Sequence, residues 1–497
     1  MLRDRQSEGG ESAVREACGV FGVVAPGRDV AQLTFDGMYA LQHRGQESAG
    51  MAVSDGHAIT VVKDMGLVTT VFDERTIACL PGDLAIGHTR YSTTGASEWR
   101  NAQPVFRASG PAGFALGHNG NLTNTADLAT QAGMLPGVVT SDSDLMSELL
   151  AHAVDQAGPD ASGPLGGGPL EAALRSVLPS LRGAFSLVVL DEHRVFGVRD
   201  PHGLRPLCLG RLGAADAPEG WVLASESPAL DIVGASFVRD VAPGELVVID
   251  AAGPRSEVLW PDGQVEPHLC IFEFVYFARP DSRLYGHEVH GARRRMGELL
   301  ATQRPVEADM VMGVPESGVP AAEGYARRSG IPYGQGLVKN RYIGRTFITP
   351  GQTARAAGVR RKLNPLRENI RGKRIVVVDD SLVRGTTQRA VAAMLREAGA
   401  AEVHLRVSSP PLMWPCFYGI DIPDREQLVA ASQSVDEIAA QLGVDSLEYL
   451  TLENLVAAID APGAGFCTAC LTGSYPVPVP LPAARGDRAV PASPVGA

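Results

Sequence analysis

The stretch Val376-Val-Val-Asp-Asp-Ser-Leu-Val-Arg-Gly-Thr-Thr387 decides the fold of the C-terminal half of the chain. The β-branched run Ile375–Val378 is typical of a strand buried on both faces of a sheet. Apolar residues of Thr387–Gly399 recur at helical spacing, and those of Val403–Val407 alternate as in a second strand. The order strand, loop, helix, strand predicts a β-loop-α-β unit, the building block of a parallel sheet.

The loop after the first strand carries groups suited to a phosphorylated sugar. Ligands of open α/β sheets bind at the carboxyl ends of the strands. Asp379 and Asp380 can accept hydrogen bonds from two neighbouring hydroxyls and can hold Mg²⁺ through oxygen. Loop amides near Gly385, the helix start and the hydroxyls of Thr386 and Thr387 can hold a phosphate. A solvated Asp pair with Thr387 as helix N-cap is the simpler alternative, but the whole run favours the phosphosugar site.

Two upstream segments are candidates to complete this site. Gly313–Gly318 (GVPESG) follows an apolar run and could cradle a pyrophosphate with its backbone amides, although alone it could be a plain turn. Lys339–Gln352 (KNRYIGRTFITPGQ) has Lys339 and Arg341 beside glycines, as expected of a mobile cationic flap over a polyphosphate. An exposed basic loop is the alternative, and the Asp pair downstream favours the flap.

The first half, from Cys18 to about Val258, has a different pattern. Short apolar strands separated by glycine turns occur in runs with helices between them, which predicts a layered α+β domain. The expected strands are Cys18–Ala25, Ala85–His88, Phe114–His118, Phe185–Leu190, Val195–Val198 and Glu245–Ile249, and the expected helices are Val30–Gln42 and Asp144–Ala153.

Composition fits a soluble protein of two or more domains, because 497 residues exceed what one hydrophobic core holds. The net charge of −12, with no long basic run, argues against a nucleic-acid partner. No apolar stretch is long enough to cross a bilayer, so no membrane partner is expected. Met1–Ala17 lacks the apolar core of a signal peptide, and an odd number of cysteines, seven, favours a reducing compartment. We therefore expect a cytoplasmic location.

Five motifs follow one another in the first half. They are Cys18–Gly22 (CGVFG), Leu41–Gly50 (LQHRGQESAG), His88–Gly95 (HTRYSTTG), His118–Leu122 (HNGNL) and Ser141–Asp144 (SDSD). Together they closely resemble the class II glutamine amidotransferase domain, an N-terminal-nucleophile hydrolase of αββα layers. The phosphosugar stretch resembles the phosphoribosyl pyrophosphate (PRPP)-binding motif of the type I phosphoribosyltransferases. The combination, from Cys18 to Tyr475, resembles the glutamine PRPP amidotransferase (amidophosphoribosyltransferase) family.

The resemblance makes Cys18 the nucleophile, whereas a buried cysteine at a strand start is by itself usually a core residue. Amide hydrolysis through a thioester needs a thiolate, a proton acceptor, an oxyanion site and anchors for the amino acid. A free α-amino group on the nucleophile can accept the proton, since its ordinary pKa of about 7.7–8 leaves part of it unprotonated near neutral pH. That chemistry requires Cys18 at the mature N-terminus, so residues 1–17 are expected to be a propeptide removed by self-cleavage.

Other catalytic roles follow from the same resemblance. The Asn119 side chain and the Gly120 amide are expected to form the oxyanion hole. Arg90 is expected to grip the α-carboxylate of glutamine and Asp142 its α-ammonium. Arg44 is expected to link glutamine occupancy to closure of the site. Taken singly, the HNGN motif could be a turn, Arg90 could form a surface ion pair and Asp142 could be a helix N-cap.

In the second half, the resemblance implies a PRPP site with Mg²⁺ held near Ser317, Asp379 and Asp380. The PRPP-binding residues that it implies are Glu316, Ser317, Lys339, Arg341, Asp379, Asp380, Ser381, Arg384, Gly385, Thr386 and Thr387.

Four further cysteines form a candidate metal site. Cys467-Thr-Ala-Cys470 is a CxxC pair, which chelates soft metals or cycles as a dithiol. Spacing alone gives zinc and an iron–sulfur cluster similar weight and leaves a structural role open. The surroundings of this pair, of Cys270 and of Cys416 resemble the iron–sulfur branch of the family, which implies one structural, oxygen-sensitive 4Fe–4S cluster.

The expected domains are the propeptide 1–17, a class II glutamine amidotransferase domain 18–258, an α/β phosphoribosyltransferase domain 259–475 and a disordered tail 476–497. The expected reaction joins them: ammonia from glutamine displaces pyrophosphate from PRPP and gives 5-phosphoribosylamine, the step that opens purine biosynthesis in the family. The family also implies a homo-oligomer, with a tetramer favoured, inhibited by purine nucleotides. Cys79 and Cys208 have no motif around them and are expected to pack.

Two rival functions remain at this point. An amidotransferase that passes ammonia to fructose 6-phosphate is disfavoured by the Ser381–Thr387 loop. A non-catalytic, DNA-binding PRPP sensor is disfavoured because it needs neither a glutaminase half nor the flap, and because the chain is acidic.

Overall fold

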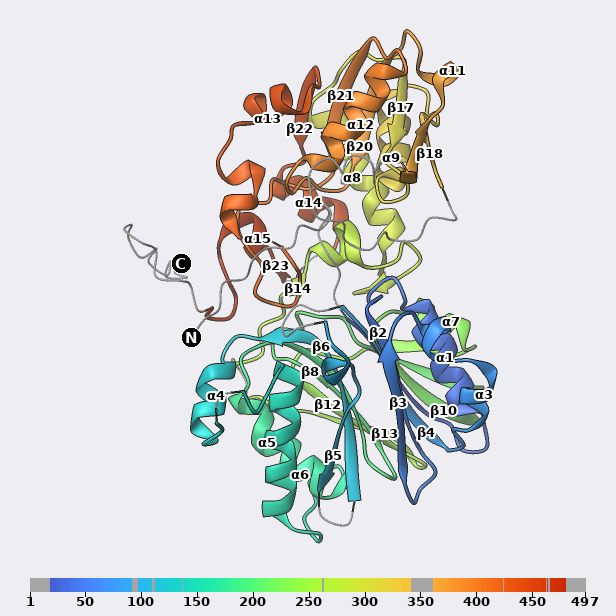
Figure 1. The fold of residues 1–497 in the computed structure, drawn as a ribbon, viewed down its shortest axis with the longest axis vertical. Coiled ribbons are helices and arrows are strands. Elements are labelled where there is room, and N and C mark those ends of the chain that lie inside the picture. The colour runs from blue at the N-terminus through green and yellow to red at the C-terminus, as the bar shows by residue number, and fades with distance from the viewer. Residues whose placement is uncertain are drawn as a thin grey trace.

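The computed structural model describes residues 18–91, 97–109, 112–135, 137–261, 263–340, 361–422, 424–461, 463 and 465–479. They form an N-terminal part with two antiparallel sheets and a C-terminal part with a parallel sheet, placed one above the other in Figure 1. Among these residues, none of the helices combines the length and the apolar character needed to cross a membrane.

The N-terminal part contains two sheets. The first has seven strands in the order β11 (Ser236–Asp240), β9 (Cys208–Gly213), β10 (Pro218–Ala224), β1 (Gly19–Val24), β4 (Leu84–Arg90), β2 (Ser48–Ser54) and β3 (Ile59–Met65). The second has six strands in the order β13 (Gly253–Val258), β12 (Glu245–Asp250), β8 (Val195–Arg199), β7 (Gly183–Leu190), β6 (Ala112–Leu122) and β5 (Val105–Ser109).

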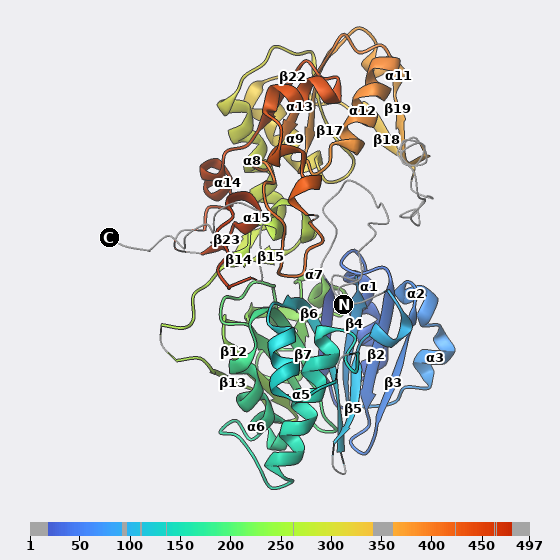
Figure 2. The ribbon, with the colours of Figure 1, turned by 60° about the vertical axis from the view of Figure 1, so that its left-hand side comes forward.

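Side-chain alternation along β1 explains how these sheets pack. Val20 and Val24 point into the core between the two sheets, where Val188 of β7 also lies. Phe21 and Val23 point to the other face, which helix α1 (Val30–Ala40) covers. Helices therefore flank both sheets, as Figures 1 and 2 show. On the first sheet they are α1, α2 (Val68–Val71), α3 (Glu74–Ala78) and α7 (Pro228–Ile232), and on the second they are α4 (Thr125–Gln131), α5 (Asp142–Ala157) and α6 (Gly168–Val177).

This αββα arrangement confirms the predicted fold class of the first half. All eight elements predicted for it are present, with ends that differ by up to four residues. The last strand, β13, ends at Val258, the residue at which the sequence placed the end of this domain.

The C-terminal part has a four-stranded parallel sheet, which confirms the predicted fold class of the second half. Its strands lie in the order β17 (Met310–Gly313), β20 (Arg374–Asp379), β21 (Glu402–Val407) and β22 (Ser446–Tyr449). In β20, Val376 and Val378 pack on one face and Ile375 and Val377 on the other, as expected of a strand buried on both sides.

The remaining described elements surround this sheet. The helices are α8 (Val289–Gln303), α9 (Val319–Ser329), α11 (Arg367–Ile370), α12 (Thr386–Glu397), α13 (Val435–Leu442), α14 (Leu452–Ile459) and α15 (Ala469–Thr472). The two-stranded sheets pair β14 (Leu269–Cys270) with β23 (Phe466–Cys467), β15 (Arg283–Leu284) with β16 (His287–Glu288), and β18 (Leu337–Lys339) with β19 (Leu363–Pro365). Short 3₁₀ turns lie at Trp99–Asn101, Leu178–Ser180, Arg425–Gln427 and Val429–Ala431, and a π-helical turn at Glu273–Phe277.

The boundary predicted for the disordered tail can be compared with the structure. Of the predicted tail, only residues 476–479 are described. Val477 is buried there, and it exchanges two hydrogen bonds with the Tyr418 hydroxyl, so the chain packs beyond the predicted boundary at Pro476.

A buried ionic network joins the two parts. Arg44, which follows α1, donates to the carboxylates of Glu226 and Glu273. Arg205 donates to the other oxygen of Glu273 at 3.2 Å. All four side chains are at most 1% exposed. Burial alone would raise the pKa of Glu226, but the Arg44 and His43 charges lower it well below its usual range. The Glu226 carboxylate is therefore ionised, and both buried glutamates have an arginine partner, as burial demands.

Candidate functional site

The predicted nucleophile lies at the start of the central strand of the first sheet. Cys18 directly precedes β1, whose first residue pairs with Thr89 of β4, and this register brings Cys18 beside Arg90 and Tyr91. The Cys18 thiol is 7% exposed and donates to the Tyr91 carbonyl oxygen at 3.4 Å. Burial raises the pKa of this thiol to about 11, although the Tyr91 bond and the Arg90 charge both lower it. A general base is therefore needed to produce the thiolate near neutral pH.

The predicted oxyanion residues lie on β6 of the second sheet. Asn119 is fully buried, and neither its amide nitrogen nor its amide oxygen has a hydrogen-bond partner among the described residues. Such a group costs about 1–3 kcal/mol unless a ligand satisfies it. A Cβ added at Gly120 would lie 2.0 Å from the Ala184 carbonyl oxygen, so only glycine fits there. The pair fits an oxyanion site, although that role itself stays a prediction.

The predicted anchors for glutamine lie near the same point. Arg90 ends β4, is 3% exposed and lies 4.0 Å from the Glu47 carboxylate. Asp142 begins α5 and accepts from the backbone amides of Leu122 at 3.2 Å and Ser143 at 2.8 Å. Burial would raise the pKa of Asp142, but the His118 charge and these hydrogen bonds lower it. Its carboxylate is therefore ionised and can pair with an ammonium group.

Two simpler explanations of these residues do not describe the structure. The N-cap of α5 is Ser141, which accepts from the Asp144 amide, so Asp142 is not the cap. Arg90 is buried and not on the surface. Arg44, the third predicted glutamine-binding residue, points into the ionic network, and its role in closure stays untested.

The predicted phosphosugar residues gather at the carboxyl edge of the parallel sheet. Asp379 ends β20, and Asp380 follows it; both are buried. Burial and the neighbouring Asp380 charge raise the pKa of Asp379 well above its usual range. The Gln388 side chain of α12 donates to Asp379 at 2.9 Å, and Asp380 interacts with the Ser317 hydroxyl. Two buried carboxylates and a hydroxyl form an oxygen-rich set that fits Mg²⁺.

Upstream segments converge on this edge because β17 and β20 are parallel neighbours, with Gly313 beside Val378. Glu316 and Ser317 follow β17 directly. Lys339 ends β18 and lies 3.6 Å from the Glu316 carboxylate. Arg341 and the rest of the predicted flap to residue 352 lie outside the described residues.

The loop Ser381–Thr387 turns the chain from β20 into α12. The Ser381 hydroxyl donates to Asp380 at 2.5 Å, and Arg384 donates to the Gln427 side chain. Gly385 is the N-cap of α12 with φ +73°, a conformation that favours glycine, and Thr386 and Thr387 start the helix. The helix amides thus face the edge where Asp379 and Asp380 lie, as a phosphate site requires.

The four predicted cluster cysteines come together at the joint of the two parts. Cys270 of β14 pairs directly with Cys467 of β23. The Cys470 carbonyl accepts from the Met413 and Trp414 amides, which brings in Cys416. All four are free thiols, and burial raises the pKa of each, that of Cys270 to about 12.

Four free thiols are a donor set that suits soft metals, because thiolate sulfur binds both zinc and iron–sulfur clusters. Among the described residues, the group of potential ligand atoms within 4.8 Å of one another is His202, Glu266 and His268, and it includes none of these cysteines. The donor set alone therefore leaves zinc and an iron–sulfur cluster open.

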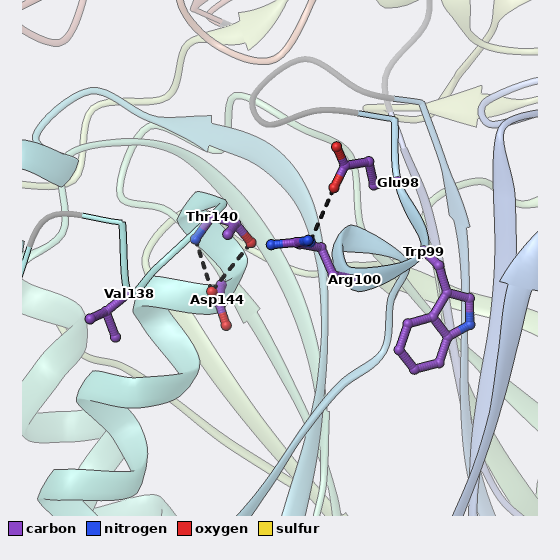
Figure 3. Close-up of a pocket in the computed structure, with 6 residues that line it drawn as sticks. All are labelled: Glu98, Trp99, Arg100, Val138, Thr140 and Asp144. Carbon is purple, nitrogen blue, oxygen red and sulfur yellow. Dashed lines mark hydrogen bonds and ion pairs between the residues drawn. The ribbon is translucent and has the colours of Figure 1, made fainter. Parts of the chain in front are cut away.

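A surface pocket beside the start of α5 contains none of the predicted site residues. Figure 3 shows the side chains that line it: Glu98, Trp99, Arg100, Val138, Thr140 and Asp144. Asp144 accepts from the Thr140 amide at 2.9 Å, and Glu98 pairs with Arg100. Most of these groups already have partners, so the pocket shows no specific chemistry.

Sequence reasoning missed several residues that contact the site. The Tyr91 carbonyl accepts from the Cys18 thiol, and Glu47 lies 4.0 Å from Arg90. The Gln388 side chain donates to Asp379. Tyr91 and Glu47 lie inside the quoted motifs, and Gln388 follows Thr387 directly, so adjacency to a motif was the available signal.

Comparisons with known proteins agree with both halves. The glutamine amidotransferase domain family matches residues 88–231, and the phosphoribosyl transferase domain family matches residues 288–409. The chain is 54% identical to the amidophosphoribosyltransferase of Mycobacterium tuberculosis, covering 98% of this chain and 91% of that one. It is 44% identical to that of Bacillus subtilis, over 94% of this chain and 95% of the other.

Two solved structures are similar over nearly the whole chain. One is the glutamine PRPP amidotransferase of B. subtilis complexed with ADP and GMP, with a TM-score of 0.83 and 43% identity over 93% of this chain and 98% of that one. The other, described as the allosteric regulatory enzyme of purine biosynthesis, has a TM-score of 0.84 and 43% identity over 93% of this chain and 97% of that one.

The unpartnered amide of Asn119 leads to a stability prediction. Asn119→Ala removes a buried polar group without a partner among the described residues, so the midpoint of thermal unfolding should not fall below that of the wild type. The matched change Asn121→Ala removes a donor to the Phe417 carbonyl at 2.9 Å and should lower the stability by about 1 kcal/mol. Differential scanning calorimetry measures both. A clear loss of stability in Asn119→Ala alone would contradict the assignment.

Proposed function

The chain belongs to the amidophosphoribosyltransferase family, and from that premise we propose which of its residues carry each half of the reaction. Glutamine hydrolysis supplies ammonia, which displaces pyrophosphate from PRPP to give 5-phosphoribosylamine, the first step of de novo purine biosynthesis. One observation supports the residue assignment above others. Cys18 and the Asn119 amide, which has no hydrogen-bond partner among the described residues, occur in the same glutaminase half as Arg90 and the ionised Asp142.

In the glutamine half, Arg90 and Asp142 bind the α-carboxylate and α-ammonium of glutamine. The Cys18 sulfur attacks the side-chain amide carbon, and the Cys18 α-amino group takes the thiol proton, since burial raises the thiol pKa to about 11. The Asn119 side chain and the Gly120 amide donate to the oxygen that becomes negative. The C–N bond then breaks, ammonia leaves with the proton, and water hydrolyses the thioester to glutamate.

In the PRPP half, Asp379 and Asp380 accept hydrogen bonds from the ribose hydroxyls, and the amides of the Ser381–Thr387 loop hold the phosphate. Mg²⁺ bound near Ser317, Asp379 and Asp380 would neutralise charge on the pyrophosphate that leaves. Gln388 holds the Asp379 carboxylate in place. Ammonia attacks C1 as the C1–O bond to pyrophosphate breaks. Because water would trap ammonia as ammonium, a sheltered passage between the halves is expected.

We further propose a 4Fe–4S cluster on Cys270, Cys416, Cys467 and Cys470, since these four thiols are free, their segments come together through β14, β23 and the hydrogen bonds to the Cys470 carbonyl, and their surroundings resemble the iron–sulfur branch of the family. When bound, it would join β14, β23 and the chain after Trp414 covalently. Purine nucleotides are proposed inhibitors, because the similar B. subtilis enzyme was solved with ADP and GMP. A cytoplasmic homo-oligomer, with a tetramer favoured, completes the proposal.

The role of Cys18 is tested by Cys18→Ala. Glutamine-dependent formation of phosphoribosylamine should fall at least about 10³-fold, because the nucleophile is lost. Synthesis from ammonium chloride should persist, since the PRPP half is intact. Cys79→Ser is the control and should keep both activities, because Cys79 is exposed, which corrects the expectation that it packs, and lies outside the site. Pyrophosphate release that needs PRPP and glutamine also separates this function from the two rivals; glutamine-dependent synthesis by Cys18→Ala at the normal rate would refute the assignment.

Processing is tested by intact mass. The active wild-type protein should lack residues 1–17, because the α-amino group of Cys18 must be free. Cys18→Ala should retain those residues if the cysteine cleaves its own propeptide. Active wild-type protein that still carries residues 1–17 would exclude the α-amino group as the base.

The cluster is tested by metal analysis of anaerobically purified protein. About four iron and four sulfide per chain are expected, with broad visible absorbance that bleaches in air. Cys467→Ser should lose this absorbance and unfold at a lower temperature, whereas Cys79→Ser should not. Stoichiometric zinc with no iron in fully active protein would show that the cysteines hold a different metal.

A further inference from the structure

A short segment of the C-terminal part lies directly against β6, the strand of the glutaminase half that carries Asn119 and Gly120. This segment, residues 416–420, follows the parallel strand β21 in the chain. The Asn121 side chain of β6 donates to the Phe417 carbonyl oxygen at 2.9 Å, although the two residues are 296 positions apart. Gly419 packs against Gly120 itself. A Cβ added to Gly419 would lie 2.8 Å from the carbonyl carbon and oxygen of Gly120. The segment thus touches the residue whose amide is proposed to stabilise the oxyanion.

Gly120 is enclosed from two sides. On one side, a Cβ at Gly120 would lie 2.0 Å from the Ala184 carbonyl oxygen of β7. On the other side lies the backbone of Gly419, which has a φ of +91° that side chains rarely tolerate. Both close approaches require glycine. The position of the Gly120 amide therefore depends on both neighbours, one from each part of the chain.

The segment is itself held firmly. Buried Arg205 donates to the Tyr418 carbonyl oxygen from Nε at 3.1 Å and from Nη2 at 2.9 Å. The same guanidinium pairs with Glu273 in the ionic network. The Tyr418 hydroxyl donates to the Val477 carbonyl at 2.6 Å and accepts from the Val477 amide at 3.0 Å. Tyr418, which directly precedes Gly419, thus has little freedom to move away from Gly120.

We propose that Gly419 is a positioning residue for glutamine hydrolysis, and that segment 416–420 forms the outer wall which fixes the Gly120 amide. This inference rests on the proposed role of Gly120. An oxyanion donor must lie about 2.7–3.1 Å from the oxygen that becomes negative, so a shift of the Gly120 backbone weakens the transition state more than the bound substrate. Gly419 touches no substrate and acts through Gly120 alone.

The test compares Gly419→Ala with Gly399→Ala in the full-length holoenzyme. Gly399 has a similar φ of +97°, but a Cβ there would meet its nearest neighbour, Arg371, at 3.4 Å, an ordinary contact. Both variants carry the same backbone strain, and only one presses on Gly120. Gly419→Ala should lower kcat with glutamine about 10- to 100-fold and change KM for glutamine less than about twofold. Gly399→Ala should stay near the wild type in both.

Ammonia-dependent synthesis serves as the internal control for folding. Gly419→Ala should keep the wild-type rate with ammonium chloride, since that half does not use Gly120. Asn121→Ala is a second variant that loosens the same wall and should also lower kcat with glutamine without a matching rise in KM. Wild-type glutamine kinetics in Gly419→Ala, or equal losses with glutamine and ammonia in both variants, would overturn the inference. A wild-type enzyme without glutamine-dependent synthesis would instead overturn the proposed function.

Discussion

The carboxylate of Glu273, shared between Arg44 and Arg205, fixes how the two halves of the molecule meet. Arg44 comes from the glutaminase half, and Glu273 lies in the turn that opens the other half. Neither charge could stay buried without its partner, because removing one member of such a pair costs about 3–5 kcal/mol. Arg205 extends the network to the Tyr418 carbonyl and so sets the chain that covers Gly120. The geometry of the glutaminase site therefore depends on how the two halves are placed relative to each other.

Much of the fold could be predicted because its strongest signals are local. The buried run before Asp379 and the helical spacing after Thr386 depend on neighbours in the chain, and the structure contains both elements. Strand β2 was missed, since its sequence SAGMAVS is buried at every position and shows neither alternation nor β-branched enrichment. Where packing on both faces removes the period and the residues are small rather than β-branched, the sequence carries no strand pattern.

The functional site was likewise predictable from the sequence only in part. Motifs located Cys18, Asn119 and Asp379 because each belongs to a compact run of residues. They did not reveal that Gly419 meets Gly120, since neither the residues around Cys416 nor the HNGN motif specifies its distant partner. A glycine in a strand or loop can indicate that a ligand or another backbone segment approaches closely, but tertiary packing decides which neighbour it is. The ionic network was hidden for the same reason: Arg44, Glu226 and Glu273 are far apart in sequence and ordinary in composition.

The four clustered cysteines lie close in sequence to both the ionic network and the segment beside Gly120. Cys270 lies three positions before Glu273, and Cys416 begins the segment that contains Phe417 and Gly419. The Arg205 guanidinium lies near both cysteine side chains and is paired with Glu273. A displacement of the chain at either cysteine would thus reach Glu273 or Gly419 within three residues. A structural group bound there would stabilise the interface and, through it, the backbone of Gly120. Such a group would therefore affect glutamine hydrolysis, if segment 416–420 of the other half forms the proposed wall of that site.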